Sequence, residues 1–130
     1  LAPFRAAAQA GVASVMISSA RYPKIDAKNQ AVFSAKVIGL VRGWGYTGVV
    51  ISDDLGAAAS VRKIPAGQRA VRFIAAGGDV VIDADPSLAP AMTKALLVKA
   101  AKDPAFAARV TESAARVLAL KQDVGLFRCS

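Results

Sequence analysis

Two adjacent carboxylates end the most apolar segment of the chain. Residues 49–56 read VVISDDLG, in which three β-branched residues lead through a serine to Asp53 and Asp54. A carboxylate held at the end of a rigid strand can act as a nucleophile or as a metal ligand. An aspartate between a strand and a helix also commonly caps that helix. The pattern alone leaves both roles open for the pair and favours the cap.

Polar residues also follow the ends of the two other apolar runs. Asp83 and Asp85 share a face if their strand continues that far, and otherwise they cap or solvate the loop before the next helix. A magnesium site there would need more oxygen ligands than the sequence places nearby. Arg21 can hold an anion or a sugar hydroxyl, and the Tyr22 ring can stack on a sugar. A solvated arginine and a tyrosine that packs its own loop are the alternatives.

The residue types that are missing exclude several kinds of site. The chain has no histidine, and its single cysteine is Cys129. Serine–histidine–aspartate and cysteine–histidine catalysis therefore have no base, and most zinc sites lack ligands. One cysteine cannot form an intrachain disulfide, so we interpret Cys129 as a bystander thiol that says little about the compartment.

The composition fits one folded domain. The 130 residues are 55% hydrophobic, and no apolar run approaches the ~20 residues that span a bilayer. The net charge of +8 is compatible with nucleic acid, anionic lipid or an acidic polymer. The 17 lysines and arginines are spread singly, without interleaved aromatic residues, which argues against a nucleic-acid module. The start shows no initiator methionine and no signal peptide, so we expect part of a longer gene product.

The apolar pattern alternates between short continuous runs and helical spacing. Continuous runs predict buried strands at 13–18, 48–52 and 79–83. We expect a first helix at 3–10 and a second from the Ser34 cap to Gly45, with Phe33 on the apolar face of this second helix. Three further helices are expected: from Pro65 to Gly77, from Asp85 or Ser87 past Lys99, and from the Asp103 cap through Leu118. This order predicts an α/β fold with a parallel sheet and right-handed crossovers.

Three parallel strands make an incomplete sheet. Each run is apolar throughout, which requires cover on both faces, and a sheet of this size leaves two open edges. A full eight-stranded barrel takes ~250 residues, so three units of ~40 residues would be its last third. We therefore expect residues 1–130 to be a partial barrel domain of the (β/α)8 type: about three βα units and a terminal helix, with the N-terminal part absent.

The expected fold places the chemistry at one edge. Ligands of parallel α/β folds lie at the C-terminal ends of the strands, where the aspartates and the Arg21–Tyr22 pair gather. Neighbouring strand residues point to opposite faces. Asp53 and Asp54 are therefore not a close dyad, and we expect one of them to be structural.

Several segments, in their order and spacing, resemble glycoside hydrolase family 3. They read LAPFRAAAQAGVASVMIS, ARYPKID, GLVRGWGYTGVVISDDLGAAA, RAVRFIAAGGDVVI and RVLALKQDVGLF. They are similar to the C-terminal part of that family's barrel domain, above all in its bacterial β-N-acetylhexosaminidases. GVVISDDL is the most specific piece. The family's β-glucosidases usually carry tryptophan after the nucleophilic aspartate, so Asp54 favours the hexosaminidase branch.

The resemblance implies strands six to eight of the barrel and a retaining mechanism through a covalent glycosyl-enzyme intermediate. It makes Asp53 the nucleophile and implies a carbohydrate substrate, terminal β-linked N-acetylglucosamine of cell-wall-type glycans, with no cofactor and no metal. Arg21 and Tyr22 lie near the expected sugar pocket as weaker candidates for substrate binding. The family often has a histidine just before this Tyr-Pro pair, and this chain reads Ser18 to Arg21 there.

The resemblance also implies a missing acid. In the hexosaminidase branch a histidine paired with an aspartate, on a loop after the fifth strand, is the acid/base. A lysine–histidine pair near it helps to bind the sugar. This chain has no histidine and begins after that loop. We therefore expect it to be inactive alone and active with the missing N-terminal part of the barrel, either in one polypeptide or as a separate chain.

Two alternatives remain open at this stage. A family member that cleaves β-glucosides or β-xylosides would share the chemistry. A non-enzymatic basic module that binds anionic polymers would explain the charge, although the open sheet edges argue against an autonomous module. The sequence leaves the compartment open between the bacterial cytoplasm and a secreted or cell-envelope location.

Overall fold

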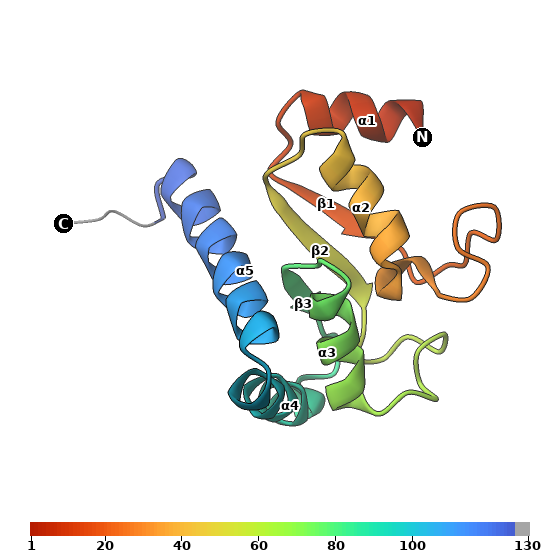
Figure 1. The fold of residues 1–130 in the computed structure, drawn as a ribbon, viewed down its shortest axis with the longest axis vertical. Helices are drawn as coiled ribbons and strands as arrows, with labels where there is room; N and C mark the ends of the chain where they lie inside the picture. The colour runs from red at the N-terminus through yellow and green to blue at the C-terminus, as the bar shows by residue number, and fades with distance from the viewer. Residues whose placement is uncertain (127–130) are drawn as a thin grey trace.

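A computed structural model describes residues 1–126, and Cys129 lies outside the described residues. Its three strands form one parallel sheet in the order β1-β2-β3, with helices packed against it (Figure 1). In chain order the elements are α1 (Ala2–Gln9), β1 (Ser14–Ile17), the 3-10 turn η1 (Ala31–Phe33), α2 (Ala35–Gly43), β2 (Val49–Asp54), α3 (Ala66–Ala75), β3 (Val80–Ile82), the 3-10 turn η2 (Pro86–Leu88), α4 (Ala89–Lys102) and α5 (Pro104–Asp123). The predicted α/β fold, its element order and its parallel sheet are confirmed.

The helices begin where side chains can satisfy their free backbone amides. Ser34 Oγ accepts from Val37 N at 3.2 Å, and Asp103 Oδ1 accepts from Phe106 N at 3.1 Å. Each bond satisfies one of the amides that the first turn of a helix leaves unpaired. These two predicted caps are confirmed. Phe33 lies in the 3-10 turn η1 ahead of the cap, so its predicted place on the helix face is wrong.

Strand β2 runs further than its apolar residues. The predicted strand ended at Ser52, whereas β2 ends at Asp54, so both aspartates belong to the strand. Parallel pairing with β1 sets Ser14 beside Val49 and Ile17 beside Ser52. On the other side β2 pairs with β3 through an irregularity between Ile51 and Asp54.

One face of the sheet packs against the helices. Val15 and Ile17 of β1 and Val50 of β2 are buried in one apolar core with Ile38 of α2 and Phe73 of α3. Gly78 lies so close to the Phe73 ring that a Cβ there would approach the ring to 2.1 Å. Gly77-Gly78 is therefore a close-packed helix end that precedes the third strand.

The opposite face of the sheet has no such cover. Met16 of β1 is 57% exposed and Ile82 of β3 is 40% exposed, while Ile51, beside Met16 on β2, is only half-buried. Because side chains alternate along a strand, these residues share the face turned away from the core. The expected cover on both faces is therefore not provided by residues 1–126.

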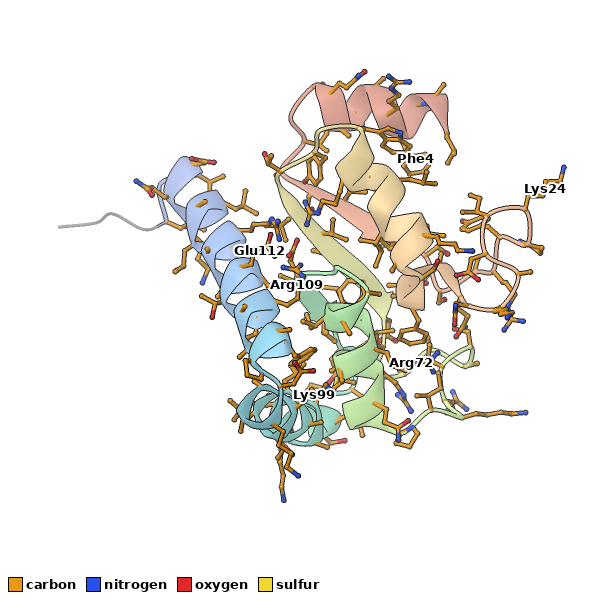
Figure 2. All side chains as sticks on the ribbon, in the orientation of Figure 1. Phe4, Lys24, Arg72, Lys99, Arg109 and Glu112 are labelled. Carbon is orange, nitrogen blue, oxygen red and sulfur yellow. The ribbon has the colours of Figure 1, made fainter. Side chains whose placement is uncertain are left out.

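A buried ion cluster ties α5 to the start of β3. The Asp79 carboxylate is fully buried, and five groups donate to it: Arg42 at 2.6 Å, Arg109 at 2.6 Å, Val50 N at 2.8 Å, Ser113 Oγ at 3.0 Å and Arg116 at 3.1 Å. Figure 2 shows Arg109 and Glu112 on the side of α5 that faces the strands. Burial raises the pKa of Asp79, but the hydrogen bonds and guanidinium charges outweigh it and hold that pKa below its usual value.

Among residues 1–126 no helix combines the length and the apolar character that crossing a bilayer requires.

Candidate active site

Asp53 stands near the C-terminal end of β2, on the uncovered face of the sheet. It is two residues beyond Ile51, so the two side chains point the same way. The Asp53 side chain is half-buried, and no helix of the described residues covers its face. The expected rim of the sheet therefore carries this carboxylate in an accessible position.

Ser19 holds one oxygen of this carboxylate. Its backbone N–H donates to Asp53 Oδ2 at 2.9 Å, and its hydroxyl donates to the same oxygen at 2.7 Å. The other oxygen, Oδ1, accepts from Asp54 N at 2.9 Å. The amide and then the hydroxyl of Ser19 lower the pKa of Asp53 below its usual value, and burial, which raises it, is outweighed. The carboxylate is therefore held in its charged form.

Ser19 was not among the residues that the sequence predicted. It lies just beyond β1, whose Ile17 is beside Ser52 of β2, so the neighbouring chain ends meet near Asp53. Ser19 is a polar residue two positions past the apolar strand β1, and Asp53 lies two positions past the apolar run of the neighbouring strand β2. These matching positions are the signal that could have identified Ser19. The contact depends on the register between the strands, which the sequence pattern did not supply.

Asp54 points to the opposite face, as the strand period predicted. Its carboxylate accepts from Gly56 N at 2.8 Å, from Ala57 N at 3.1 Å and from Ala84 N at 3.0 Å. The Ala84 amide is the main cause that lowers the pKa of Asp54. The predicted helix cap is wrong, because α3 begins only at Ala66. Asp54 instead ties the turn after β2 to the segment after β3.

Arg69 of α3 fixes the loop that follows the two aspartates. Its side chain is buried, and its guanidinium donates to the carbonyl oxygens of Leu55 and Gly56 at 2.8 Å and of Ile64 at 2.6 Å. A hydrogen bond to Arg62 O at 3.3 Å completes this set. The loop 55–64 is therefore anchored at both ends by one side chain.

Gly56 is required for a close approach of the same loop to the end of β3. A Cβ at this position would lie 1.8 Å from Asp83 Oδ1 and 2.9 Å from Asp85 N. Both distances are shorter than real Cβ atoms show, and one of the two neighbours is backbone. The loops after β2 and β3 therefore pack directly on one another beside the candidate nucleophile.

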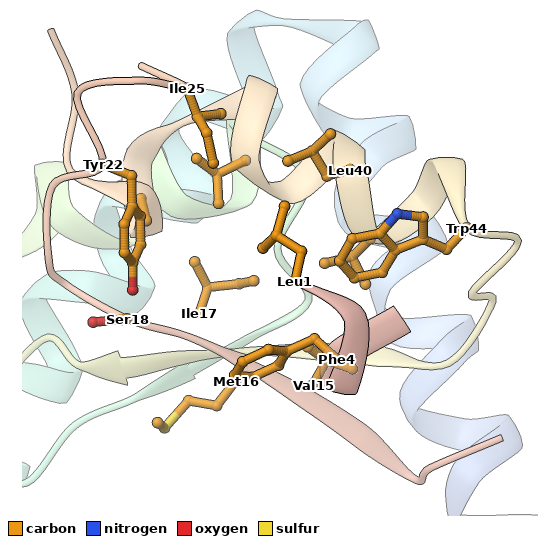
Figure 3. Close-up of a pocket in the computed structure, with 13 residues that line it drawn as sticks. Leu1, Phe4, Val15, Met16, Ile17, Ser18, Tyr22, Ile25, Leu40 and Trp44 are labelled. Atoms are coloured by element: carbon orange, nitrogen blue, oxygen red, sulfur yellow. The ribbon is translucent and has the colours of Figure 1, made fainter. Parts of the chain in front are cut away.

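The weaker candidates, Arg21 and Tyr22, do not reach Asp53. The Tyr22 ring lines an apolar pocket of about 210 Å³ with Leu1, Ile17 and other side chains of α1, β1 and α2 (Figure 3). In the described part of the chain the Arg21 side chain makes no hydrogen bond or ion pair. The structure therefore does not bring this pair together with Asp53, and their role in substrate binding stays a prediction.

Asp83 and Asp85 serve the loop after β3. That strand ends at Ile82, so the two residues do not share a strand face. Asp85 accepts from Ser87 N at 3.2 Å and caps η2, and Asp83 Oδ1 accepts from Asp85 N at 3.0 Å. The predicted capping role is confirmed for Asp85. Within residues 1–126 no group of three or more potential ligands is placed to hold a metal ion.

The surroundings of Asp53 are compatible with a nucleophilic carboxylate. Asp53 is charged, it is fixed from the neighbouring strand, and among residues 1–126 its Oδ1 accepts from Asp54 N alone, which leaves that oxygen a lone pair. A carboxylate of this kind can form a covalent bond with an electrophilic carbon. The side chain that contacts it here is a serine hydroxyl, which is too weak an acid to protonate a leaving group by itself.

Comparison with protein families identifies a match over most of the chain. The model described as the glycosyl hydrolase family 3 N terminal domain matches residues 1–120. Among curated relatives, a beta-hexosaminidase of Stenotrophomonas maltophilia is 40% identical over 90 residues, and one of Xanthomonas oryzae is 37% identical over 89 residues. Each alignment covers 68% of this chain and 27% of the relative. The chain thus spans about a quarter of the length of these relatives.

Solved structures resemble the whole described fold. The β-N-acetylhexosaminidase of Beutenbergia cavernae is 43% identical with a TM-score of 0.87, over 92% of this chain and 36% of that one. A glycoside hydrolase family 3 β-N-acetylglucosaminidase from Paenibacillus is 33% identical with a TM-score of 0.86, over 100% of this chain and 26% of that one. The second similarity extends from α1 to α5.

Proposed function

The chain belongs to glycoside hydrolase family 3, and on that premise we propose that it supplies the nucleophile of a retaining β-N-acetylhexosaminidase. The observation that carries the proposal is the charged, positioned Asp53 at the accessible end of β2. The names of the similar proteins, beta-hexosaminidase and β-N-acetylglucosaminidase, support the choice of sugar. The substrate we propose is a glycan with a terminal β-linked N-acetylhexosamine, of the cell-wall type.

We further propose that residues 1–130 form the C-terminal third of a (β/α)8 barrel domain. The exposed Met16 and Ile82 support this, because a barrel turns such residues inward to a packed interior. The open edges of β1 and β3 support it as well, since neighbouring strands would pair with them. The chain also spans only about a quarter to a third of its relatives. The rest of the barrel is thus the principal partner of this surface.

The proposed reaction has two steps. Asp53 attacks the anomeric carbon, and a carbon–oxygen bond forms while the bond from that carbon to the aglycone oxygen breaks. The departing oxygen takes a proton from a general acid. Water then attacks the same carbon and gives its proton back to the group that acted as the acid, while the bond from the carbon to Asp53 breaks and the carboxylate is released, so the configuration is retained.

The general acid lies outside this chain in our proposal. The chain has no histidine, and the side chain that touches Asp53 is Ser19. We therefore place the acid in the remaining part of the full-length protein, on the loop that the family resemblance indicates. The separate chain is expected to be inactive, and the complete barrel to be active.

A covalent trap tests the nucleophile directly. The full-length protein is treated with a fluorinated N-acetylglucosaminyl donor that forms the intermediate quickly and releases it slowly. Trypsin cuts after Arg42 and Arg62, so peptide 43–62 contains Asp53 and Asp54 as its only acidic residues. We expect the label on this peptide, and fragmentation to place it on Asp53. A label on another peptide, or hydrolysis that survives Asp53→Asn, contradicts the proposal; Asp54→Asn is the matched control and is expected to keep the label.

A further inference from the structure

We propose that Ser19 is the positioning residue for Asp53: it holds Oδ2 through two hydrogen bonds and leaves Oδ1 to attack the anomeric carbon. The inference rests on the proposed function, because it concerns the same carboxylate. Ser19 reaches Asp53 from the neighbouring strand, 34 residues earlier in the chain. The contact therefore fixes the carboxylate against an independent element of the fold.

The hydrogen bonds distinguish the two carboxylate oxygens. A carboxylate has about two acceptor sites on each oxygen. Both sites of Oδ2 are occupied, by Ser19 N at 2.9 Å and by Ser19 Oγ at 2.7 Å. Oδ1 accepts only from Asp54 N, at 2.9 Å, among the described residues. Oδ1 therefore keeps the free lone pair that a nucleophile needs.

Ser19 is itself held in place by Gln30. The Gln30 side-chain amide donates to Ser19 O at 3.0 Å and to Ser60 O at 3.1 Å. One amide thus joins the loop after β1 to the loop after β2. With its carbonyl fixed in this way, Ser19 presents its N–H and O–H to Asp53 as a preorganised pair, which loses little freedom on each turnover.

The two steps of the reaction use Ser19 differently. Attack by Oδ1 neutralises the carboxylate, so donors that stabilise its charge give little help to the first step. In the covalent ester, Oδ2 is the carbonyl oxygen, and it regains negative charge as the sugar leaves. Preorganised donors that point to an oxygen where charge develops accelerate such a step. Ser19 should therefore matter most for hydrolysis of the intermediate.

This asymmetry gives a kinetic test in the full-length protein. With an aryl β-N-acetylglucosaminide that has a good leaving group, kcat reports the second step and kcat/KM the first. We expect Ser19→Ala to lower kcat about 10-fold, as for loss of one hydrogen bond to a charged group. We expect kcat/KM to fall by less than about 3-fold, and KM to fall because the intermediate accumulates.

The pH profile supplies a second readout. Loss of the hydroxyl raises the pKa of Asp53, so the acid limb of kcat/KM should move upward by about half to one pH unit. The other ionisable groups near this end of the sheet are Asp54 on β2, Asp83 and Asp85 after β3, and Arg21 after β1. None of them forms a hydrogen bond with Ser19 in the described residues, so the substitution leaves their hydrogen bonds unchanged.

Matched variants separate positioning from a merely structural role. Ser19→Thr keeps the hydroxyl and should restore both kcat and the acid limb. Ser19→Cys is nearly isosteric, and its thiol is a weaker hydrogen-bond donor than the hydroxyl. It should therefore lower kcat more than kcat/KM, as Ser19→Ala does but by a smaller factor. This comparison remains available if Ser19→Ala unfolds at a lower temperature than the wild type. Ser18→Ala removes a neighbouring hydroxyl that accepts from Ala20 N at 3.0 Å, and it should leave the acid limb in place.

The outcomes distinguish this inference from the proposed function. Equal falls in kcat and kcat/KM, an unmoved acid limb and no rescue by Ser19→Thr would overturn the positioning role. Values of kcat and kcat/KM in Ser19→Ala that equal those of the wild type would overturn the positioning role as well. Neither result bears on the nucleophile assignment, which fails only if Asp53→Asn still hydrolyses the substrate or the trap labels another residue.

Discussion

Arg109 of α5 lies 2.6 Å from Asp79, whose carboxylate has no exposed surface. Arg42 of α2 and Arg116 of α5 contact the same carboxylate, and Glu112 pairs with Arg109 and Arg116, so Asp79 is the acidic group shared by all three arginines. Asp79 N also donates to Val50 O at 2.8 Å, so the cluster is continuous with the backbone of β2. The helix that closes the chain is thus fixed to the strand that carries the candidate nucleophile.

Asp79→Asn is expected to destabilise the full-length protein by about 1–3 kcal/mol, because it removes the fully buried charge that accepts from three half-buried guanidinium groups, of which Arg109 and Arg116 keep Glu112 as a partner. Chemical denaturation monitored by circular dichroism measures this. Lys99→Ala is the control, because Lys99 pairs with Asp103 on the exposed side of α4, where a salt bridge contributes little. A loss as small as that of Lys99→Ala would show that the cluster contributes no net stability.

Acidification should remove the contribution of Asp79 to the free energy of unfolding. Its pKa is lower in the folded protein than the value of about 3.9 in an unfolded chain. When the pKa of an acidic group is lower in the folded state than in the unfolded state, the group stabilises the fold fully at pH values above its unfolded-state pKa. This stabilisation is lost as the pH falls through the folded-state pKa. The difference in unfolding free energy between the wild type and Asp79→Asn should therefore be constant above about pH 5 and shrink below about pH 4. A difference that grows on acidification contradicts this account.

The sequence predicted the features that depend on neighbours along the chain. Asp53 and Asp54 face opposite sides because of the strand period, and Ser34 and Asp103 cap helices because of their local spacing. The resemblance then assigned different roles to the two aspartates. These inferences required no knowledge of which distant segments meet.

The features that the sequence missed depend on pairing between distant segments. Ser19 reaches Asp53 only through the register of β1 against β2. Arg69 looks like an exposed helix residue in the sequence, yet it is buried because four carbonyl oxygens surround its guanidinium. The helix-cap expectation for Asp54 failed because a loop of ten residues, 55–64, separates it from Pro65, the N-cap of α3.

Arg69→Leu should loosen the loop 55–64. The change removes one side chain that satisfies four carbonyl oxygens, and each buried group left without a partner costs about 1–3 kcal/mol unless water reaches it. We expect faster tryptic cleavage after Arg62 and Lys63, read by mass spectrometry, and a lower kcat because Asp53 lies only two residues before this loop. Arg72→Leu, an exposed arginine over the Phe33 ring, should leave the cleavage rate unchanged. Equal cleavage in both variants rules out the anchoring role.

Gly56→Ala should reduce hydrolysis by displacing the end of β3. The new Cβ would meet Asp83 Oδ1 at 1.8 Å and the backbone Asp85 N at 2.9 Å, and the backbone contact forces the loop after β2 away from the loop after β3. We expect kcat to fall at least about 10-fold, since small displacements near a reacting group are costly. The matched control is Gly39→Ala in α2, where a Cβ has open space and helix propensity favours alanine by about 1 kcal/mol. Similar kinetics in the two variants would argue against a tightly packed rim.

Met16→Glu tests the barrel. Met16 is 57% exposed in residues 1–126, and on this surface a glutamate costs little. In a closed barrel the same side chain faces the packed interior, where an unpaired carboxylate is strongly unfavourable. We therefore expect the variant to lower the unfolding free energy of the full-length protein by more than about 3 kcal/mol. Leu97→Glu on α4, which is 67% exposed, is the control and should change it little. If both variants are equally tolerated, the uncovered face of the sheet is a true surface and the barrel proposal is wrong.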